Sequence, residues 1–496
     1  MKRTKIVCTI GPASETKVII EKMVRAGLNV ARLNFSHGVY KHHQMLIDNI
    51  RSVSKNLNQP VAIMQDLQGP RIRIGEVPAE GIPIKKNQEL ALVPEKYKFQ
   101  DKKFVTVPTQ YPDLYKDIKK GHEILVEDGT IVLQVTNVKK PVIFCRVKSG
   151  SLIKSHKGMN FPGVSISAPA ITDKDKKDLV FGIKNNVDFV ALSFVKDDKD
   201  IIILRKLIAN LEKKQKSDWP KFKNVQSKNK KSWPDTSTKI IAKIERPEAI
   251  KNFEKILKVV DGIMVARGDL GLEAPIQDLP LMQKKIVRLC NQAGKPVIVA
   301  TQMLDSMIRN PMPTRAEVTD VANAILDGTD GIMLSGETAT GQYPLQAVEI
   351  MNKIANRMEA TQIRNFEKTE QDLKHLGDVA FSFSFATQDI AEDIKAKLIV
   401  CVTIGGFSAR LVSRFKPKIP VIGLTPLPKT RNQLALSWGV QSYDLPYTTS
   451  FEKLVSGIKK IILQNKLAKA GDQIVLLASY PLEFSKKPNL VSVVDL

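Results

Sequence analysis

Residues 239–245 read KIIAKIE, residues 261–270 read DGIMVARGDL, residues 296–303 read PVIVATQM, and residues 330–337 read DGIMLSGE. Each run is short, almost continuously apolar and rich in β-branched residues, which predicts a parallel strand that is buried on both faces. The same pattern occurs in four runs nearer the N-terminus, namely TKIVCTIG (4–11), VARLNFS (30–36), VAIMQDL (61–67) and VDFVALSF (187–194). The sequence therefore predicts eight buried strands.

Amphipathic helical segments lie between most of these strands. Ser14 precedes one that ends at Gly27, and Thr172 and Thr314 precede two others, as helix-capping residues do. Pro247 occupies the first position of a fourth segment, where proline is favoured. This alternation predicts the α/β class and a (β/α)8 TIM barrel. An open doubly wound sheet is the alternative, but its Gly-rich dinucleotide turn is absent from the sequence.

Polar residues occupy the ends of the predicted strands. A barrel strand needs no acid or lysine to fold, and an unpaired buried charge is costly. The carboxyl ends of barrel strands meet at one mouth, where the active sites of such barrels lie. We therefore expect one site formed there by Asn34, Ser36, Asp66, Lys243, Glu245, Asp269, Thr301, Ser335 and Glu337.

The spacing of the strands divides the chain into three domains. Residues 1–70 and 168–345 account for the catalytic barrel, whose typical size is about 250 residues. Residues 71–167 contain short strand-like segments and an Asp-Gly turn at 128–129, which predict a small inserted β-barrel lid domain at the mouth. Residues 346–496 restart the strand–helix pattern and predict a C-terminal α/β domain.

Composition limits the classes of function. The chain has 496 residues, of which 43% are hydrophobic and 26% charged, as in an ordinary globular protein. No apolar stretch is long enough to span a bilayer and the four cysteines lie far apart, so we expect a soluble cytoplasmic protein without disulfides. Lys and Arg total 76 against 51 acidic residues, a net charge of +25. Because the lysines are scattered, a general bias in composition explains this charge better than nucleic-acid binding.

One basic patch is dense. Residues 213–231 carry eight lysines and a single acid between the fourth and fifth predicted strands. We interpret the stretch to Pro234 as a solvated insertion, with a contact to RNA or to an acidic partner as the alternative.

Two carboxylates and a lysine carry the clearest chemistry. Glu245 and Asp269 end successive predicted strands and could hold one Mg²⁺, which usually binds through one or two carboxylates, water and substrate oxygens. Lys243 lies two residues before Glu245, so both side chains leave the same face of the strand. A lysine beside a metal site can stabilise a phosphoryl group in transfer. Arg32 and Arg73 could bind phosphate or carboxylate bidentately.

Several longer stretches resemble pyruvate kinase. They are KRTKIVCTIGPAS, GLNVARLNFSHG, HKGMNFPG, KIERPEAI, DGIMVARGDLGLE, ATQMLDSM and PTRAEVTDVANAILDGTDGIMLSGETATGQYP. The resemblance covers almost the whole chain and implies transfer of the phosphoryl group of phosphoenolpyruvate to ADP, then protonation of enolpyruvate. It also implies a Mg²⁺ cofactor, a second Mg²⁺ that enters with ADP, and a homotetramer.

The same resemblance implies roles for individual residues. Lys243 would neutralise the moving phosphoryl group, and Thr301, Arg73, Ser335 and Glu337 would complete the catalytic set. The remaining implied roles are substrate binding by Arg32, Ala266, Arg267, Gly268, Asp269 and Thr301, nucleotide binding by Asn34, His37, Arg73 and Lys157, and Mg²⁺ binding by Glu245 and Asp269.

Asn34, Ser36, Asp66 and Leu67 resemble the site that holds a monovalent cation in most such enzymes. Leu67 stands where threonine is common, and Arg71 stands where glutamate is common. The chain thus resembles the potassium-independent branch, in which a basic side chain supplies the charge of the ion. We therefore expect that K⁺ is not required.

Three points stay open at this stage. The loop 403–408 has glycines before a helix, as anion sites do, but Gly405 replaces a hydroxyl residue of the usual effector loop. A Mg²⁺-dependent barrel enzyme that acts on a pyruvate enolate without a nucleotide is an alternative function. A basic binding protein on an inactive enzyme scaffold is another alternative.

Overall fold

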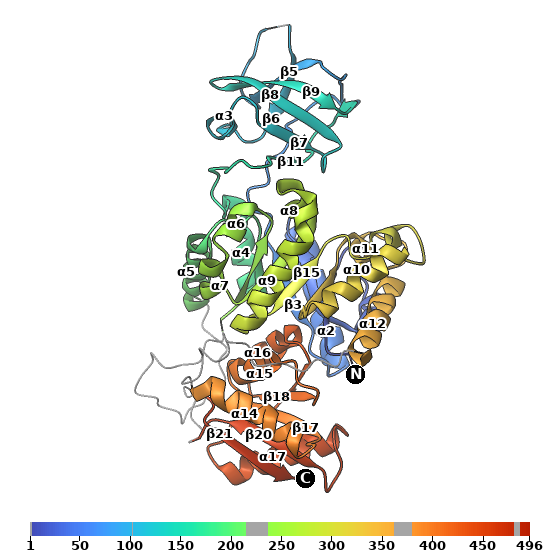
Figure 1. Ribbon diagram of the computed structural model, residues 1–496, viewed down its shortest axis with the longest axis vertical. Helices are drawn as coiled ribbons and strands as arrows, with labels where there is room; N and C mark the ends of the chain where they lie inside the picture. The colour runs from blue at the N-terminus through green and yellow to red at the C-terminus, as the bar shows by residue number, and fades with distance from the viewer. Residues whose placement is uncertain (1, 102, 215–236, 362–378, 481–486) are drawn as a thin grey trace.

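The structure is a computed structural model that describes residues 2–101, 103–214, 237–361, 379–480 and 487–496. Figure 1 shows three bodies stacked along the long axis, with a β domain at one end, the barrel in the middle and the C-terminal domain at the other end. The barrel therefore contacts one smaller domain at each end.

Eight parallel strands form the closed barrel, in the order β1-β16-β15-β14-β13-β12-β3-β2. This result confirms the eight predicted strands and the (β/α)8 fold. One apolar cluster lies between the strands and the helices and a second fills the barrel interior, which explains the continuous apolar runs. The strands are β1 (Lys5–Thr9), β2 (Leu28–Asn34), β3 (Ala62–Asp66), β12 (Phe189–Leu192), β13 (Lys239–Ile244), β14 (Gly262–Ala266), β15 (Val297–Ala300) and β16 (Gly331–Leu334).

The helices around the barrel begin largely where the sequence predicts. Thr172 and Thr314 each form a capping box with the acid three residues later. Thr16, rather than the predicted Ser14, caps the first helix, because its Oγ1 accepts a hydrogen bond from the N–H of Ile19 at 3.3 Å. The helices are α1 (Lys17–Ala26), α2 (Tyr40–Asn56), α4 (Asp173–Lys184), α5 (Asp198–Lys214), α6 (Pro247–Lys251), α7 (Phe253–Val259), α8 (Arg267–Glu273), η2 (Ile276–Asp278), α9 (Leu279–Ala293), η3 (Asp305–Ile308), α10 (Arg315–Leu326), α11 (Gly336–Ala339) and α12 (Pro344–Thr361).

Helix α12 corrects the predicted boundary between the barrel and the C-terminal domain. Its buried residues Ala347, Val348 and Met351 belong to the apolar cluster that surrounds the barrel strands. The helix also packs against α1 and α10. By packing, the barrel therefore extends through α12, and the predicted boundary at residue 345 is too early.

The β domain is inserted between β3 and α4 and has its own apolar core. Its main sheet has the order β11-β7-β8-β9-β5-β6, and β4 pairs with β10 in a separate sheet. The backbone of Arg73 forms a β-bridge with Gly158, beside β11, and the backbone of Ile74 forms one with Thr109 of β6. This segment therefore links the two ends of the main sheet. The elements are β4 (Ile82–Pro83), β5 (Glu89–Pro94), β6 (Val105–Thr109), α3 (Leu114–Asp117), β7 (Glu123–Val126), β8 (Ile131–Lys139), β9 (Val142–Ser149), β10 (Leu152–Ile153) and β11 (Met159–Asn160).

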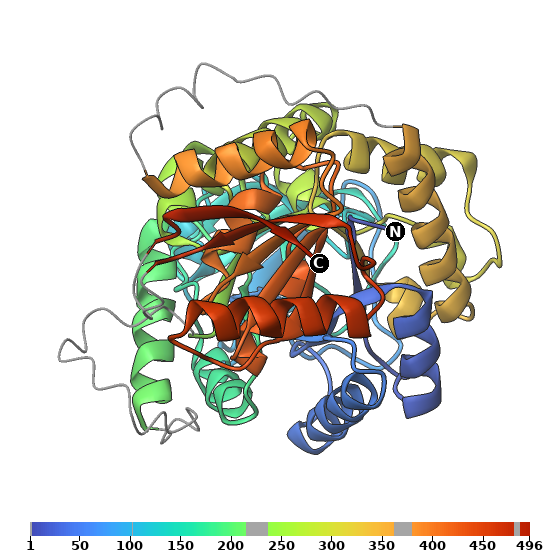
Figure 2. The same ribbon diagram turned by 90° about the horizontal axis from the view of Figure 1, so that it is seen from below.

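The C-terminal domain is a five-stranded sheet with the order β19-β18-β17-β20-β21, in which only β21 is antiparallel to its neighbour. Figure 2 shows this sheet between α14 and α17. The described elements are α14 (Val379–Asp393), β17 (Leu398–Val402), α15 (Phe407–Ser413), β18 (Val421–Thr425), α16 (Pro428–Gln433), η4 (Leu434–Leu436), β19 (Val440–Asp444), α17 (Phe451–Gln464), β20 (Gln473–Ala478) and β21 (Leu490–Asp495).

This domain covers the amino ends of the barrel strands. Lys5 of β1 donates a hydrogen bond from Nζ to the carbonyl oxygen of Val440 at 2.7 Å. Buried Lys416 pairs with buried Asp330, which directly precedes β16. We refer to this contact region as the lower junction.

Two predictions meet the limits of the described residues. Within those residues, no helix has the length and apolarity needed to cross a membrane. Of the basic patch at 213–231, only Lys213 and Lys214 at the end of α5 are described, and the rest lies outside the described residues.

Candidate active site

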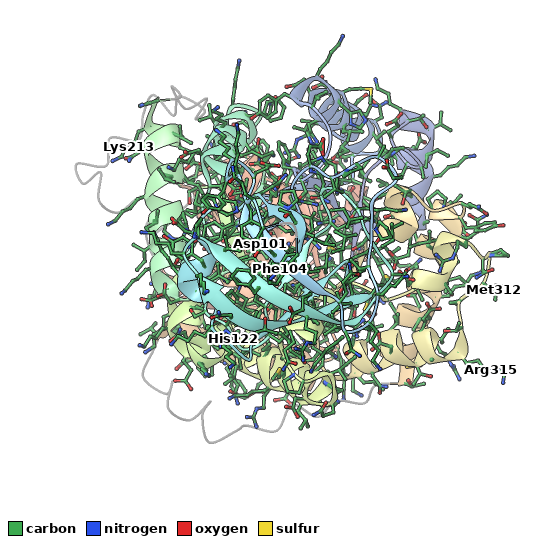
Figure 3. The ribbon with its side chains drawn as sticks, turned by 90° about the horizontal axis from the view of Figure 1, so that it is seen from above. Asp101, Phe104, His122, Lys213, Met312 and Arg315 are labelled. Carbon is green, nitrogen blue, oxygen red and sulfur yellow. The ribbon has the colours of Figure 1, made fainter. Side chains whose placement is uncertain are left out.

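The carboxyl ends of the barrel strands face the β domain. Figures 1 and 3 show that the sheet of this domain lies above the mouth of the barrel. Most of the polar residues at the strand ends are brought together there, because all eight strands run in the same direction.

Lys243 lies at the centre of the polar cluster. Its Nζ is 2.8 Å from Oε1 of Glu245 and 3.4 Å from Oδ1 of Asp66, and it donates a hydrogen bond to Oγ of Ser193 at 2.8 Å. The three partners come from the ends of three strands that are adjacent in the barrel, β3, β12 and β13. The register of the barrel therefore builds this cluster.

Burial and charge act in opposite directions on these groups. Burial alone would lower the pKa of Lys243, but the carboxylates of Asp66 and Glu245 outweigh it and raise that pKa above its usual range. Burial alone would raise the pKa of Asp66, but Lys243 and Arg32 hold it below its usual range. The cluster therefore keeps an ammonium group and a carboxylate fully charged at neutral pH.

Arg32 of β2 anchors the other side of Asp66. Its Nε donates to Oδ2 of Asp66 at 2.7 Å, and its Nη1 donates to Oγ1 of Thr9 at 2.8 Å. With only 11% of its side chain exposed, the guanidinium is oriented by the barrel rather than by solvent. This arrangement leaves a fixed cation at the mouth.

Glu245 has the properties of a metal ligand. Its Oε2 accepts a hydrogen bond from the N–H of Phe194 at 2.7 Å, whereas its buried Oε1 makes no well-aligned hydrogen bond despite lying near Lys243. Burial and the charge of Asp269 raise the pKa of Glu245, because both disfavour its negative charge. A bound cation would offset the free-energy cost of that buried charge.

Asp269 supplies the second carboxylate. It lies in the first turn of α8, directly after the neighbouring strand β14, and its side chain is 21% exposed. Among the described residues no group of three His, Cys, Asp or Glu side chains could hold a metal. Asp269 is near enough for its charge to raise the pKa of Glu245, so these two carboxylates could hold one Mg²⁺ that is completed by water and substrate oxygens.

The turn at 266–269 is tied to Thr301. Oγ1 of Thr301 accepts a hydrogen bond from the N–H of Gly268 at 2.7 Å, and the Arg267 guanidinium donates to the carbonyl oxygen of Thr301 at 2.9 Å. Thr301 has φ +71°, a left-handed conformation that costs a β-branched residue free energy and is found where a site requires it. Arg267 also pairs with Asp320, so its side chain braces the turn.

Ser335 and Glu337 follow β16, and in the described part of the chain neither hydrogen-bonds nor pairs with Lys243. Glu337 is buried, and its carboxylate accepts hydrogen bonds from the N–H of Ser335 at 2.7 Å and of Leu304 at 3.1 Å. Burial raises the pKa of Glu337. The two residues therefore brace the loop after Thr301 in this structure.

The residues expected on the nucleotide side lie at the boundary between barrel and lid. Arg73 donates to the carbonyl oxygen of His156 at 2.9 Å, and Lys157 pairs with Glu127 at 2.5 Å. Oδ1 of Asn34 accepts a hydrogen bond from the N–H of Ser36 at 3.1 Å. Burial and the cations Arg73, Arg71, Arg32 and Lys174 lower the pKa of His37.

Within the described residues, Asp66 pairs with Arg32 and Lys243 and forms no ion pair with Arg71. The Arg71 guanidinium instead lies 3.6 Å from Oδ1 of Asp128 in the lid and 3.9 Å from Oδ1 of Asp269. Leu67 points into the apolar cluster outside the barrel, and only its carbonyl oxygen, which accepts a hydrogen bond from Ser193 at 2.7 Å, faces the polar cluster.

Sequence reasoning missed three residues of this region. Ser193 ends β12 in the run VDFVALSF, so its place at a strand end was a usable signal. Asp175 accepts a hydrogen bond from the N–H of Gly69, and Glu273 contacts the second connection to the lid. Asp175 is the capping-box acid three residues after Thr172, a spacing that could have signalled it, whereas Glu273 lies in α8, where nothing in the sequence distinguishes it from a surface residue.

Comparison with known proteins agrees with this geometry. The family model described as "Pyruvate kinase, barrel domain" matches residues 1–227 and 217–348, and "Pyruvate kinase, alpha/beta domain" matches residues 382–494. The chain is 41% identical to the pyruvate kinase of Clostridium acetobutylicum over 99% of both chains. It is 42% identical to that of Staphylococcus saprophyticus over 97% of this chain and 78% of that protein. A crystal structure of a pyruvate kinase from Cryptosporidium parvum superposes with a TM-score of 0.87 at 35% identity, covering 100% of this chain and 96% of the other. The chain belongs to the pyruvate kinase family.

Proposed function

We propose that the protein transfers the phosphoryl group of phosphoenolpyruvate to ADP, which yields pyruvate and ATP. The observation that carries this proposal is the half-buried ammonium group of Lys243 between the carboxylates of Asp66 and Glu245 at the barrel mouth. Phosphoryl transfer requires positioning and neutralisation of charge more than covalent chemistry, and this cluster provides both.

Each residue has a task in the proposed reaction. Glu245 and Asp269 would hold Mg²⁺, which would supply positive charge to the reaction when bound. Lys243 and Arg32 place two further fixed cations at the mouth, where negative charge develops on the group in transfer. The turn at 266–269 orients the substrate carboxylate, and Thr301 lies on the side from which enolpyruvate takes its proton. Ser335 and Glu337 support the loop beside Thr301.

The lid carries the nucleotide side of the proposed site. Arg73 and Lys157 supply cations for the phosphates of ADP, and Asn34 and His37 lie on the barrel side of the same boundary. A domain in this place excludes water and so favours transfer to ADP over hydrolysis. We further propose that the enzyme works in the cytoplasm, and its four free, buried cysteines suit a reducing compartment.

An assay coupled to lactate dehydrogenase tests the function. Pyruvate should form from phosphoenolpyruvate only when both ADP and Mg²⁺ are present. Turnover that is independent of ADP would favour the alternative barrel enzyme that acts on a pyruvate enolate. Salt-sensitive retention on nucleic acid without any turnover would favour a binding protein on an inactive scaffold.

We also propose that K⁺ is not required. Leu67 has no side-chain oxygen for an ion and its side chain points away into the apolar cluster outside the barrel, while Arg71 adds a permanent positive charge at the mouth. Activity with Mg²⁺ should be near its maximum without K⁺ at constant ionic strength. Arg71→Glu should weaken activity and partly restore a K⁺ requirement. Tenfold or greater activation of the unaltered protein by K⁺ would contradict the proposal.

A homotetramer is the proposed assembly. Ile276 and Leu281, beside α8 and on α9, are 73% and 69% exposed, and β21 is an edge strand that exposes Val493. Exposed apolar side chains and open strand edges are common at subunit interfaces. Light scattering should give about four times the mass of the chain, and Leu281→Glu should give a smaller species. A monodisperse monomer for the unaltered chain would contradict this assembly.

A further inference from the structure

Glu273 joins the barrel to the lid at the last residue of α8. Its Oε1 accepts hydrogen bonds from Nδ2 of Asn160 at 2.9 Å and from the N–H of Phe161 at 3.2 Å. Asn160 is the last residue of β11, so both donors lie where the chain leaves the lid and returns to the barrel. Glu273 and Asn160 are only 8% and 4% exposed, so the contact is shielded from water.

The same helix also meets the tip of a lid hairpin. A Cβ added to Gly129, in the turn between β7 and β8, would lie 3.6 Å from Cδ2 of Leu272. Arg71, in the first connection to the lid, lies between Asp128 of that turn and Asp269 of α8. Three separate parts of the lid and its connections therefore approach α8.

The other end of α8 belongs to the active site. Asp269 lies in its first turn, and the N–H of Gly268 donates a hydrogen bond to Oγ1 of Thr301 at 2.7 Å. A helix of seven residues is only about 10 Å long, so Glu273 attaches the lid close to the turn that carries Asp269.

The chemistry of Glu273 is unusual for a packing residue. Burial raises the pKa of Glu273, while its bonds from Asn160 and Phe161 and the charge of Arg246 act in the opposite direction. Arg246 is itself buried, and its Nη1 has no hydrogen-bond partner within the described structure. A buried carboxylate is costly unless it is hydrogen-bonded. The two hydrogen bonds from the lid therefore explain the carboxylate at this buried position better than packing does.

We propose that Glu273 is a positioning residue that fixes the orientation of the lid relative to the helix that carries Asp269. The inference rests on the proposed function, because the lid is expected to carry the cations that meet ADP. Loss of the tether then affects ADP more than phosphoenolpyruvate, since Arg32, Lys243 and the turn at 266–269 stay on the barrel. A purely structural brace would instead lower stability and leave the ratio of the two KM values unchanged.

Two substitutions separate the hydrogen bonds from the charge. Glu273→Gln retains an acceptor oxygen for both donors, whereas Glu273→Leu has similar volume and no acceptor. Asn160→Ala removes one of the two donors on the lid side. This variant tests the same tether if Glu273→Leu does not fold. Each variant is compared with the full-length enzyme by steady-state kinetics with both substrates varied, and by hydrogen exchange of the segment that contains the Phe161 amide.

Glu273→Leu should raise the KM for ADP about tenfold, because leaving buried donors without an acceptor has a free-energy cost of that scale. The KM for phosphoenolpyruvate should change less than about twofold. Asn160→Ala should show a smaller change of the same kind, and Glu273→Gln should stay close to the unaltered enzyme. Exchange around Phe161 should accelerate in the Leu variant and not in the Gln variant.

Equal changes in both KM values, no change in either, or a Gln variant as impaired as the Leu variant would overturn the proposal. Unchanged exchange around Phe161 in the Leu variant would overturn it as well. Absence of ADP-dependent turnover in the unaltered protein is a separate result: it would refute the proposed function, and the exchange measurement would still decide whether the tether exists.

Discussion

The two ends of the barrel both bury charged groups, but they do so differently. At the lower junction, Lys416 is paired with Asp330, and Lys5 donates to the carbonyl oxygen of Val440. At the mouth, Lys243 lies among two carboxylates and a hydroxyl group, and among the described residues Oε1 of Glu245 has no well-aligned hydrogen bond. Buried charge alone therefore does not identify a functional site; at the mouth the charged groups converge from adjacent strand ends, whereas at the lower junction they pair across two domains.

The difference also has an energetic meaning. A buried ion pair often contributes little to net stability, but removing one partner is strongly destabilising because a buried charge is left alone. The Lys416–Asp330 pair of the lower junction is complete within the chain, so it holds two domains together. The charges at the mouth are incompletely satisfied until substrate and metal arrive, so their cost is offset in the bound complex.

The largest expected effect is at Lys243. Lys243→Met removes the cation that meets the group in transfer, so kcat should fall on the order of 10³-fold with a modest change in the KM for phosphoenolpyruvate. Steady-state kinetics of the purified variant measures this. A fall of less than about tenfold would show that another group stabilises the phosphoryl group.

The same substitution at the other end of the barrel is the matched control. Lys416→Met leaves the buried carboxylate of Asp330 without its partner, which should cost about 3–5 kcal/mol of stability. The kcat of the fraction that remains folded should stay within about twofold, because no catalytic group is displaced. A loss of kcat as large as that of Lys243→Met would erase the distinction between the two ends.

Asp269→Asn should have an intermediate effect. The substitution weakens one of two Mg²⁺ ligands at a partly exposed position, so the Mg²⁺ concentration for half-maximal activity should rise by about tenfold or more. Titration of activity with Mg²⁺ measures the shift, and Asp327→Asn, an acid paired with Lys284 far from the mouth, is the control. An unchanged Mg²⁺ dependence would remove Asp269 from the metal site.

The smallest expected effect is a pH dependence at the lower junction. Burial lowers the pKa of Lys5 to about 8, whereas in the unfolded chain it stays near 10.5. Between these values the unfolded state binds more protons than the folded state, so the contribution of Lys5 to stability rises with pH. Below pH 8 the folded protein bears the full cost of burying a charged ammonium group.

Thermal unfolding of Lys5→Met at several pH values isolates this contribution. Relative to the variant, the unaltered protein should gain roughly 4–8 °C in Tm between pH 7 and pH 9.5, because the two pKa values change the stability by about 2 kcal/mol over that range. A difference in Tm that does not change with pH would mean that Lys5 keeps the same proton in both states.

Much of the fold could be predicted from the sequence, because its signals are local. Buried parallel strands give apolar runs, and capping boxes at Thr172 and Thr314 mark helix starts. The boundary at residue 345 could not be predicted, because α12 resembles any amphipathic helix until its partners α1 and α10 are known. The N-cap residue of α1 could not be predicted either, because serine and threonine are both common N-cap residues and the sequence offers Ser14 and Thr16.

The candidate site was predictable to the extent that it lies on strand ends. Lys243, Glu245 and Asp66 were expected together, and the barrel register brings them together. The contacts of Arg71 could not be read from the sequence, because they depend on how the lid is seated. Glu273 was missed for the same reason: its partners Asn160 and Phe161 lie more than a hundred residues away in the chain.

Phosphorus-31 NMR can follow the phosphoryl group that the barrel mouth is proposed to transfer from phosphoenolpyruvate to ADP. In a reaction containing the protein, phosphoenolpyruvate, ADP and Mg²⁺, the γ-phosphate signal of ATP should grow in equal measure as the phosphoenolpyruvate signal declines. Lys243→Met should nearly abolish both changes. Growth of an inorganic phosphate signal in place of ATP, or consumption of phosphoenolpyruvate with ADP left unchanged, would contradict the proposed transfer.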